Sequence, residues 1–232
     1  MDHPDFGRAA PCRCKTDALK KSRLERLFQM SRMGEQLRNM TFDTFETDGI
    51  PYDEAVLAHP AHRQEIFRSL KRALRNAQSY ADDPSSWLVL LGDYGCGKTH
   101  LAVAIANARI QRGEPALFQV VPDLLDHLRA TFSPTSTVTY DVLFDEVRTA
   151  PLLILDDLGA HSSSPWAEEK LFQIVNYRYN HRLPTVVTTN APLDRLEPRL
   201  VSRMTDMGSV RLAIAAPDFR GGLAPRGGQP RR

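Results

Sequence analysis

Residues 92–99 constrain the fold of this chain more than any other part of its sequence. They read GDYGCGKT, which fits the phosphate-loop pattern Gly-x-x-x-x-Gly-Lys-Thr, and the apolar run WLVLL at positions 87–91 leads directly into them. Apolar residues then recur at helical spacing over residues 101–108. A strand, a glycine-rich loop and a helix in this order predict a site whose backbone N–H groups and helix N-terminus face a phosphate.

The side chains of this loop suit a nucleoside triphosphate with its magnesium ion. Lys98 would reach the β- and γ-phosphates, and Thr99 would offer its hydroxyl to Mg²⁺, because a hard cation prefers oxygen ligands. A glycine-rich turn that precedes Lys-Thr by chance is the alternative, and the flanking strand and helix disfavour it. The residues expected to hold ATP are Gly92, Gly95, Cys96, Gly97, Lys98, Thr99 and His100.

The length of 232 residues allows one α/β domain with a substantial core and a smaller N-terminal part. We expect a basic arm over residues 1–50, the nucleotide-binding domain over 51–216, and a disordered tail rich in Gly, Pro and Arg over 217–232. No apolar run approaches the roughly 20 residues that span a bilayer, and no secretory stretch opens the chain. We therefore expect a cytoplasmic protein without a membrane partner.

The net charge is only +2, but lysine and arginine are concentrated at both ends of the chain. These basic ends could contact nucleic acid or an acidic partner, or they could simply favour solubility. Cys12 and Cys14 form a Cys-x-Cys pair near the start. A structural zinc ion usually needs four ligands, and His3 would add only a third. We interpret the pair as part of an incomplete zinc module, and expect no zinc in this chain.

Strand-like and helix-like segments alternate along the chain, which is typical of a parallel sheet. TFDTF at positions 41–45 suits a short extended segment held against the main domain. Besides 87–91, the expected strands are 116–120, 152–155, 185–189 and 210–214. The expected helices are 62–80, one from Thr99 to Gly113, 123–132, 141–148, one beginning at Pro165, and 197–207.

Two of these strands end in polar residues suited to ATP hydrolysis. PLLILDDLG at positions 151–159 is a Walker B pattern, in which Asp156 would reach Mg²⁺ and Asp157 would face the attacking water. Asn190 follows the next strand and could orient that water without adding charge. The alternatives are a solvated acidic turn for the carboxylates and a plain turn residue for Asn190.

With these motifs, the chain resembles the AAA+ ATPases, and more narrowly the bacterial helicase-loader family of DnaC and DnaI, with the transposase helper IstB as a relative. The resemblance covers residues 41–214 and depends on GDYGCGKTHLAVAIAN, LLILDDLGAHSSSPWAEEKLFQIVNYRY and LPTVVTTN. It implies a three-layer P-loop NTPase with a parallel five-stranded sheet of order 5-1-4-3-2 and no C-terminal helical lid. It implies that Asn190 is sensor 1. It also implies an arginine finger that acts on the ATP of a neighbouring subunit, for which Arg203 is the best match and Arg199 the second. A surface salt bridge is the alternative for Arg203.

The resemblance also implies that residues 122–149 form a helical insertion that touches single-stranded DNA. Arg129 could hold a phosphate there and Phe132 could stack on a base, although packing of Phe132 against the sheet is equally compatible with the sequence. Asp157 stands where most of these enzymes carry Glu, so we expect slow hydrolysis. The expected lack of a lid, and of the sensor 2 arginine that a lid carries, indicates that the protein uses ATP as a switch and not as a motor.

The interpretation we favour is a helicase loader that acts in DNA replication. ATP and Mg²⁺ would order a homo-oligomer, the insertion would engage single-stranded DNA, and the basic arm would hold a replicative helicase until hydrolysis releases it. The alternatives are an IstB-like ATPase that remodels target DNA for a transposase and an adaptor that binds ATP without hydrolysing it. A small-molecule kinase is disfavoured, because no acceptor pocket or lid is visible after the fifth strand.

Overall fold

The computed structural model describes residues 34–48, 60–133, 139–160, 164–206 and 208–219. Its centre is a parallel sheet with the strand order β2-β3-β4-β1-β5, which confirms the expected order read from the other edge. The strands are rich in apolar residues because both faces of a parallel sheet are covered. They are β1 (Trp87–Leu91), β2 (Leu117–Val120), β3 (Leu153–Asp156), β4 (Thr185–Thr189) and β5 (Val210–Ala213).

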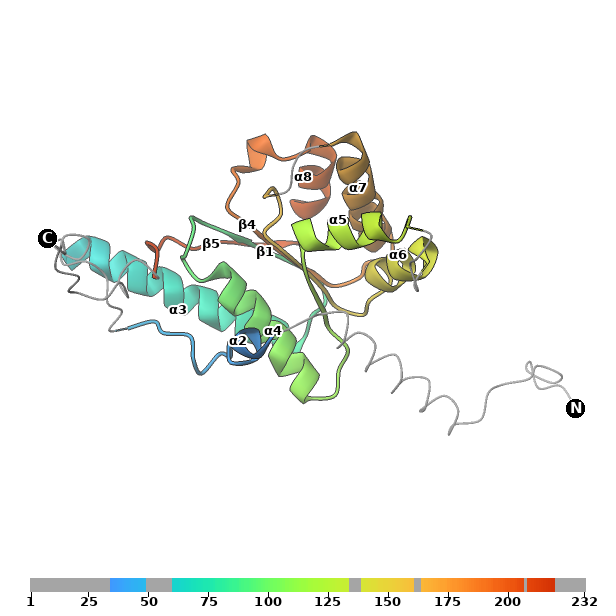
Figure 1. Ribbon diagram of the computed structural model, residues 1–232. Helices are drawn as coiled ribbons and strands as arrows, with labels where there is room; N and C mark the ends of the chain where they lie inside the picture. The colour runs from blue at the N-terminus through green and yellow to red at the C-terminus, as the bar shows by residue number, and fades with distance from the viewer. Residues whose placement is uncertain (1–33, 49–59, 134–138, 161–163, 207, 220–232) are drawn as a thin grey trace, which may run out of the picture.

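Helices cover both faces of this sheet and form the outer two of three layers (Figure 1). One face carries α2 (Glu35–Arg38), α3 (Pro60–Asp82) and α4 (Lys98–Gln111). The other carries α5 (Val121–Ala130), α6 (Tyr140–Arg148), α7 (Pro165–Asn180) and α8 (Pro198–Met204), with the 3-10 turn η1 (Leu193–Arg195). None of the described residues 214–219 is helical. Within the described part of the chain, no helix combines the length and hydropathy that crossing a membrane requires.

α4, which follows the phosphate loop, is the most deeply buried helix of the fold. Every residue from Leu101 to Asn107 is buried. A helix that is apolar all round must be covered on every side, and α4 lies between the sheet and the helices α2 and α3. The base of the phosphate loop is therefore held rigidly by the core.

The segment before α3 packs against α4. Asn107 of α4 donates its side-chain amide to the carbonyl oxygens of Leu37, Arg38 and Met40 at 3.1, 3.3 and 2.8 Å. Leu37 and Met40 also pack against the core cluster on this face. Residues 34–48, which the composition assigns to a basic arm, thus lie against the nucleotide-binding domain.

The expectation of an extended segment at residues 41–45 is wrong, because these residues form a turn. The N–H of Phe45 donates to the carbonyl of Phe42 at 3.4 Å, and the N–H of Thr41 donates to Thr44 Oγ1 at 2.9 Å. The threonine hydroxyls satisfy backbone groups locally, which is how Thr favours turns over strands. The turn lets both aromatic rings pack against the same core cluster.

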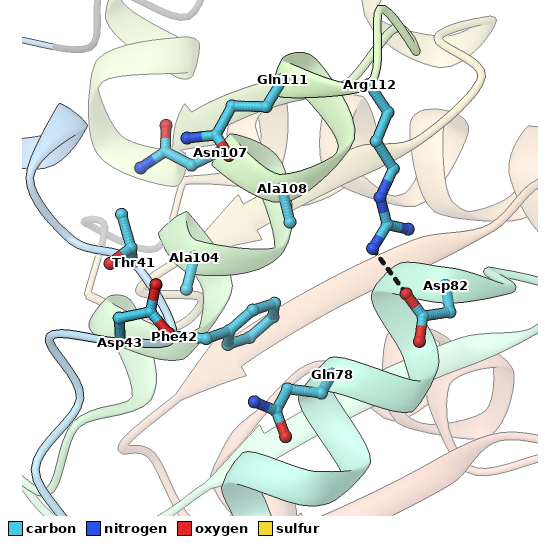
Figure 2. A pocket seen from close by; sticks show the side chains of 10 residues that line it. All are labelled: Thr41, Phe42, Asp43, Gln78, Asp82, Ala104, Asn107, Ala108, Gln111 and Arg112. Atoms are coloured by element: carbon cyan, nitrogen blue, oxygen red, sulfur yellow. Dashed lines mark hydrogen bonds and ion pairs between the residues drawn. The ribbon is translucent and has the colours of Figure 1, made fainter.

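A pocket of about 400 Å³ lies between this turn, α3 and the later turns of α4 (Figure 2). Its strongest donors are already paired: Arg112 binds Asp82 at 2.6 Å and the carbonyl of Ala81 at 3.3 Å, and Asn107 donates to the three carbonyls named above. The polar groups of this pocket therefore hold α2, α3 and α4 together. The lining residues are Thr41, Phe42, Asp43, Gln78, Asp82, Ala104, Asn107, Ala108, Gln111 and Arg112.

Candidate nucleotide-binding site

The phosphate loop connects β1 to α4, and its glycines are required by backbone conformation and by close neighbours. Gly95 and Gly97 have φ angles of 72° and 100°, in the left-handed region that L side chains rarely adopt. A Cβ at Gly97 would also lie 2.7 Å from the ring of Phe45. The loop thus brings backbone N–H groups to the N-terminus of α4, as the sequence pattern predicts.

Lys98 begins α4 and is held inside the loop. Its Nζ donates to the carbonyl oxygens of Gly92 and Asp93 at 2.9 and 2.7 Å, and only 8% of the residue is exposed. Cys96 Sγ lies 3.8 Å from the same ammonium, and burial raises the pKa of this thiol. Cys96 is therefore a packed, neutral side chain, and Lys98 supplies the positive charge at the centre of the loop.

Thr99 and Asp156 meet at the carboxyl edge of the sheet, where the sequence predicts the metal site. The Thr99 hydroxyl lies 3.1 Å from both carboxylate oxygens of Asp156, which is only 4% exposed. Burial raises the pKa of Asp156, while hydrogen bonds from Thr188 and Thr99 oppose the increase. A carboxylate and a hydroxyl in contact are oxygen donors of the kind that Mg²⁺ binds, so these residues fit the expected ion.

Thr188 of β4 organises both acidic residues, a role that the sequence analysis did not assign. Its hydroxyl lies 2.7 Å from Asp156 Oδ1, and it accepts the backbone N–H of Asp157 at 2.9 Å. Asp157 has a φ of 61°, which is uncommon for a residue with a side chain. Backbone strain of this kind concentrates at functional sites, where neighbouring contacts maintain it.

Asn190 follows β4 and lines a cleft of about 400 Å³ beside the phosphate loop. Tyr94 of the loop also lines the cleft and is 70% exposed. The charged residues Glu168, Arg195 and Glu197 contribute to its wall, and the sequence analysis did not single them out for this site. The remaining lining residues are Leu158, Gly159, Ala160, Ala191, Pro192, Leu196 and Leu200.

His100, in the first turn of α4, faces the turn formed by residues 41–45. Its Nε2 donates to the carbonyl of Thr41 at 2.9 Å, and its ring meets Phe45 edge-on with centroids 5.2 Å apart. Burial lowers the pKa of this imidazole. A neutral His100 therefore joins the N-terminal turn to the helix of the phosphate loop.

Arg203 of α8 packs on α7. Its Nε donates to Asn176 Oδ1 at 3.2 Å, and its guanidinium lies over the ring of Tyr179 at 4.6 Å. Arg199, the second candidate finger, pairs with Glu197 at 2.6 Å and lies over Phe172 at 4.1 Å. Both arginines therefore contact side chains of α7, and Arg199 also contacts Glu197, the N-cap residue of α8.

The two residues predicted to touch DNA lie in an aromatic cluster at the ends of α5, α6 and α7. Phe132 is 60% exposed, stacks on Tyr140 with centroids 5.3 Å apart, and meets Trp166 edge-on at 6.4 Å. The guanidinium of Arg129 lies 5.0 Å from the centre of the Trp166 ring. Phe132 therefore packs against aromatic rings at the surface, and packing against the sheet does not account for it.

Cys12 and Cys14 lie outside the described residues. Within the part of the chain that the structure describes, no three His, Cys, Asp or Glu side chains gather as a metal site would require.

Comparisons with known proteins give relationships that match this geometry. The family model "IstB-like ATP binding protein" matches residues 68–206. The replicative helicase loader DnaC of Buchnera aphidicola subsp. Acyrthosiphon pisum is 27% identical over 187 residues, which cover 81% of this chain and 70% of that protein. The loader DnaI of Bacillus subtilis is 30% identical over 111 residues, 47% of this chain and 35% of that protein. A crystal structure of the DnaC helicase loader superposes with a TM-score of 0.60 at 27% identity, covering 78% of this chain and 99% of the other.

Proposed function

This chain belongs to the IstB-like ATP-binding protein family, within the AAA+ ATPases of the DnaC and DnaI type, and we propose that it is an ATP-controlled helicase loader. It would act in DNA replication in the cytoplasm, with a replicative helicase and single-stranded DNA as partners. We infer the helicase partner from the names of the relatives, because DnaC and DnaI are both described as replicative helicase loaders.

The observation that supports this function most is the contact of Thr99 with Asp156 beside the phosphate loop. Lys98 would exchange its carbonyl partners for phosphate oxygens, and Thr99 and Asp156 would hold Mg²⁺. A bound Mg²⁺ would supply positive charge, which lowers the cost of the negative charge that develops during phosphoryl transfer. Thr188 fixes the orientation of the Asp156 carboxylate and of the Asp157 backbone.

Asp157 would accept a proton from the attacking water, and Asn190 would orient that water from the end of β4. Asp157 is one methylene shorter than the glutamate it replaces, so the water would be held less closely. Slow hydrolysis suits a protein that changes state once per loading event.

Arg203 would act on the ATP of a neighbouring subunit in a homo-oligomer. To do so it would leave Asn176 and Tyr179, so ATP binding and assembly would be coupled through this change of partner. Mixing two inactive variants tests the idea. Lys98→Ala lacks a working site but offers Arg203, whereas Arg203→Ala has an intact site, so the mixture should regain ATPase activity that neither variant has alone. Absence of such complementation would exclude an arginine finger in trans at Arg203.

The aromatic cluster of Phe132, Tyr140 and Trp166 is the surface that we propose binds single-stranded DNA. An exposed aromatic ring provides a stacking platform for a base of any sequence, and a nearby guanidinium can pair with a phosphate. Arg129 is positioned for the second role, although its Asp126 neighbour at 3.5 Å offsets part of the charge.

Co-purification with the host's replicative helicase tests the loader function directly. The full chain should retain the helicase, release it when ATP and single-stranded DNA are added, and fail to release it when Lys98 is replaced by Ala. If the wild-type chain retained no helicase in any nucleotide state, the loader function would be refuted.

A second candidate is supported by the family model itself, which is named for the IstB-like proteins. An IstB-like helper would remodel target DNA for a transposase. Such a protein should bind duplex DNA more tightly than single-stranded DNA at the same salt concentration, whereas a loader should show the opposite preference.

A further inference from the structure

The 3-10 turn η1 is fixed against the residues that follow the Walker B carboxylates. A Cβ placed on Gly159 would lie 2.8 Å from the side chain of Leu196 and 3.0 Å from that of Ala191, so both pack directly on this glycine. Thr189 Oγ1 accepts the N–H of Ala191 at 3.1 Å and donates to the carbonyl of Leu158 at 2.6 Å. The segment after β4 therefore has a defined position relative to the acidic end of β3.

Arg195 is the last residue of η1, and it lines the cleft beside the phosphate loop together with Asn190 and Tyr94. Its side chain is exposed. Among the described residues, its guanidinium has no partner in a hydrogen bond, salt bridge or ring contact. Arg199 and Arg203, which follow it in the sequence, are both paired. Arg195 is therefore available to an anion that enters the cleft.

Two carboxylates also line this cleft, and neither is bonded to Arg195. Glu197 accepts Arg199 Nε at 2.6 Å and the N–H of Leu200 at 2.9 Å. Glu168 forms no salt bridge with Arg195 in the described part of the chain. A guanidinium presents planar, paired donors that match phosphate oxygens, so the anion that suits Arg195 best is a phosphate group.

We propose that Arg195 is a further catalytic residue, which contacts the γ-phosphate of the ATP bound to its own subunit. The inference depends on the proposed ATP site. Arg195 precedes Leu196, which packs on Gly159 two residues beyond Asp157, so its place beside the Walker B carboxylates is set within one chain. Arg203 lies instead on α7 and is proposed to act on a neighbouring subunit.

Arg195 acts through its charge and exchanges no proton. During hydrolysis the water oxygen bonds to the γ-phosphorus and Asp157 accepts the proton of the water. The bond from that phosphorus to the β–γ bridging oxygen breaks, and its electron pair leaves with ADP. The guanidinium stays protonated and donates N–H groups to the γ-phosphate oxygens, where it neutralises charge that develops in the transition state. It therefore favours ATP over ADP in binding and also raises the rate of hydrolysis.

Nucleotide binding and turnover by Arg195→Ala in the full chain test this role. The variant should bind a non-hydrolysable ATP analogue roughly tenfold more weakly than the wild type, as for loss of a hydrogen bond between charged groups, and should bind ADP equally well. Its kcat should fall by about a hundredfold or more. Arg195→Lys should keep the preference for the ATP analogue but recover only part of kcat, because an ammonium lacks the planar pair of donors. Arg75→Ala, at an exposed position of α3, is the control and should match the wild type.

Mixed variants separate action within a subunit from action across subunits. A mixture of Lys98→Ala with Arg195→Ala should not regain activity, because the only intact phosphate loops belong to subunits that lack their own Arg195. Regained activity in this mixture would place Arg195 across the interface and overturn the proposal. Wild-type kcat and ATP affinity in Arg195→Ala would also overturn it, while the ATP site itself remained. If the wild type bound no ATP, the proposed function would fail, and the assignment of Arg195 with it.

Discussion

The hydroxyl of Thr188 lies 2.7 Å from Asp156 Oδ1 and simultaneously accepts the backbone N–H of Asp157. One side chain of β4 thus positions the two acidic residues at the end of β3. The placement of the carboxylate proposed to bind Mg²⁺ and that of the proposed base are therefore linked through this hydroxyl.

Replacement of Thr188 by Val should therefore impair hydrolysis more than ATP binding. Valine keeps the shape of the side chain but removes the bond to Asp156, and loss of a partner that orients a metal ligand typically costs about ten- to hundredfold in activity. Steady-state turnover should fall by that factor with a small change in KM, and Thr188→Ser should restore most of it. Equal loss in the Ser and Val variants would show that the hydroxyl has no orienting role.

Asp156 should reduce the stability of the metal-free fold at neutral pH. Burial raises the pKa of Asp156 above its ordinary value of 3.8, so the folded state holds the proton of this carboxyl group more tightly than the unfolded state does. The stabilisation that results is fully present below pH 3.8 and is lost as the pH rises through the raised pKa. Asp156→Asn should therefore unfold at a higher temperature than the wild type at pH 7 without Mg²⁺, and the difference should diminish as pH falls toward 3.8. Thermal denaturation against pH measures both effects.

The unfolding temperature should also show whether Asp156 binds Mg²⁺. Added Mg²⁺ with ATP should raise the unfolding temperature of the wild type more than that of Asp156→Asn, because only the carboxylate can ligate the ion well. A variant that gained as much from Mg²⁺ as the wild type would remove Asp156 from the metal site.

Arg178 should be among the most sensitive positions of the fold. It is fully buried, and its guanidinium donates to Thr185 Oγ1 at 2.9 Å and to the carbonyls of Arg148, Ala150 and Pro184 at 3.0, 2.7 and 2.5 Å. Burial lowers the pKa of this group to about 9, and the hydrogen bonds replace its lost hydration.

Arg178→Met should lower the free energy of unfolding by about 3 kcal/mol or more, because buried carbonyls lose their donors. Urea denaturation measures the change. Arg75→Met, at an exposed position of α3, should differ from the wild type by about 0.5 kcal/mol or less. Similar stabilities for the two variants would contradict a structural role for the buried guanidinium.

Phe132 and Arg129 should affect single-stranded DNA binding in different ways. Phe132→Ala should weaken binding by about 1–3 kcal/mol without changing its salt dependence, because a stacked base carries no counterion. Arg129→Gln should reduce the slope of log affinity against log salt by roughly 0.7, the value for one phosphate contact on a single strand.

Arg72→Gln, on the opposite helical layer, is the control for loss of one positive charge and should change neither quantity. Fluorescence anisotropy at several salt concentrations gives both the affinity and the slope. If Phe132→Ala and Arg129→Gln bound DNA as tightly as the wild type, the aromatic cluster would not be the DNA surface.

The residues of the phosphate loop and the Walker B strand could be predicted from the sequence because their chemistry is local. GDYGCGKT contains its own turn glycines, lysine and threonine, and the apolar run before Asp156 marks a strand that ends at the same edge. Strand order came from the family resemblance, since periodicity alone does not say which strands are neighbours. The sequence therefore predicts that Thr99 and Asp156 belong to one site.

Three features could not be predicted in this way, for physical reasons. Thr188 looks like an ordinary β-branched strand residue, and only the pairing of β3 with β4 turns its hydroxyl toward Asp156. The turn at residues 41–45 depends on local hydroxyl bonds that compete with an extended chain. The contact of Asp218 with Gly95 depends on the path of the chain after β5, which a Gly- and Pro-rich composition does not specify.

The central claim is that Lys98, Thr99 and Asp156 form one site for magnesium and ATP. ATP turnover by Lys98→Ala, beside the wild type and the exposed-lysine control Lys71→Ala, measures it most directly. The account predicts Mg²⁺-dependent turnover in the wild type and in Lys71→Ala, and loss of at least about a hundredfold in Lys98→Ala, as for removal of a group that stabilises transition-state charge. Turnover by Lys98→Ala at the wild-type rate would contradict it.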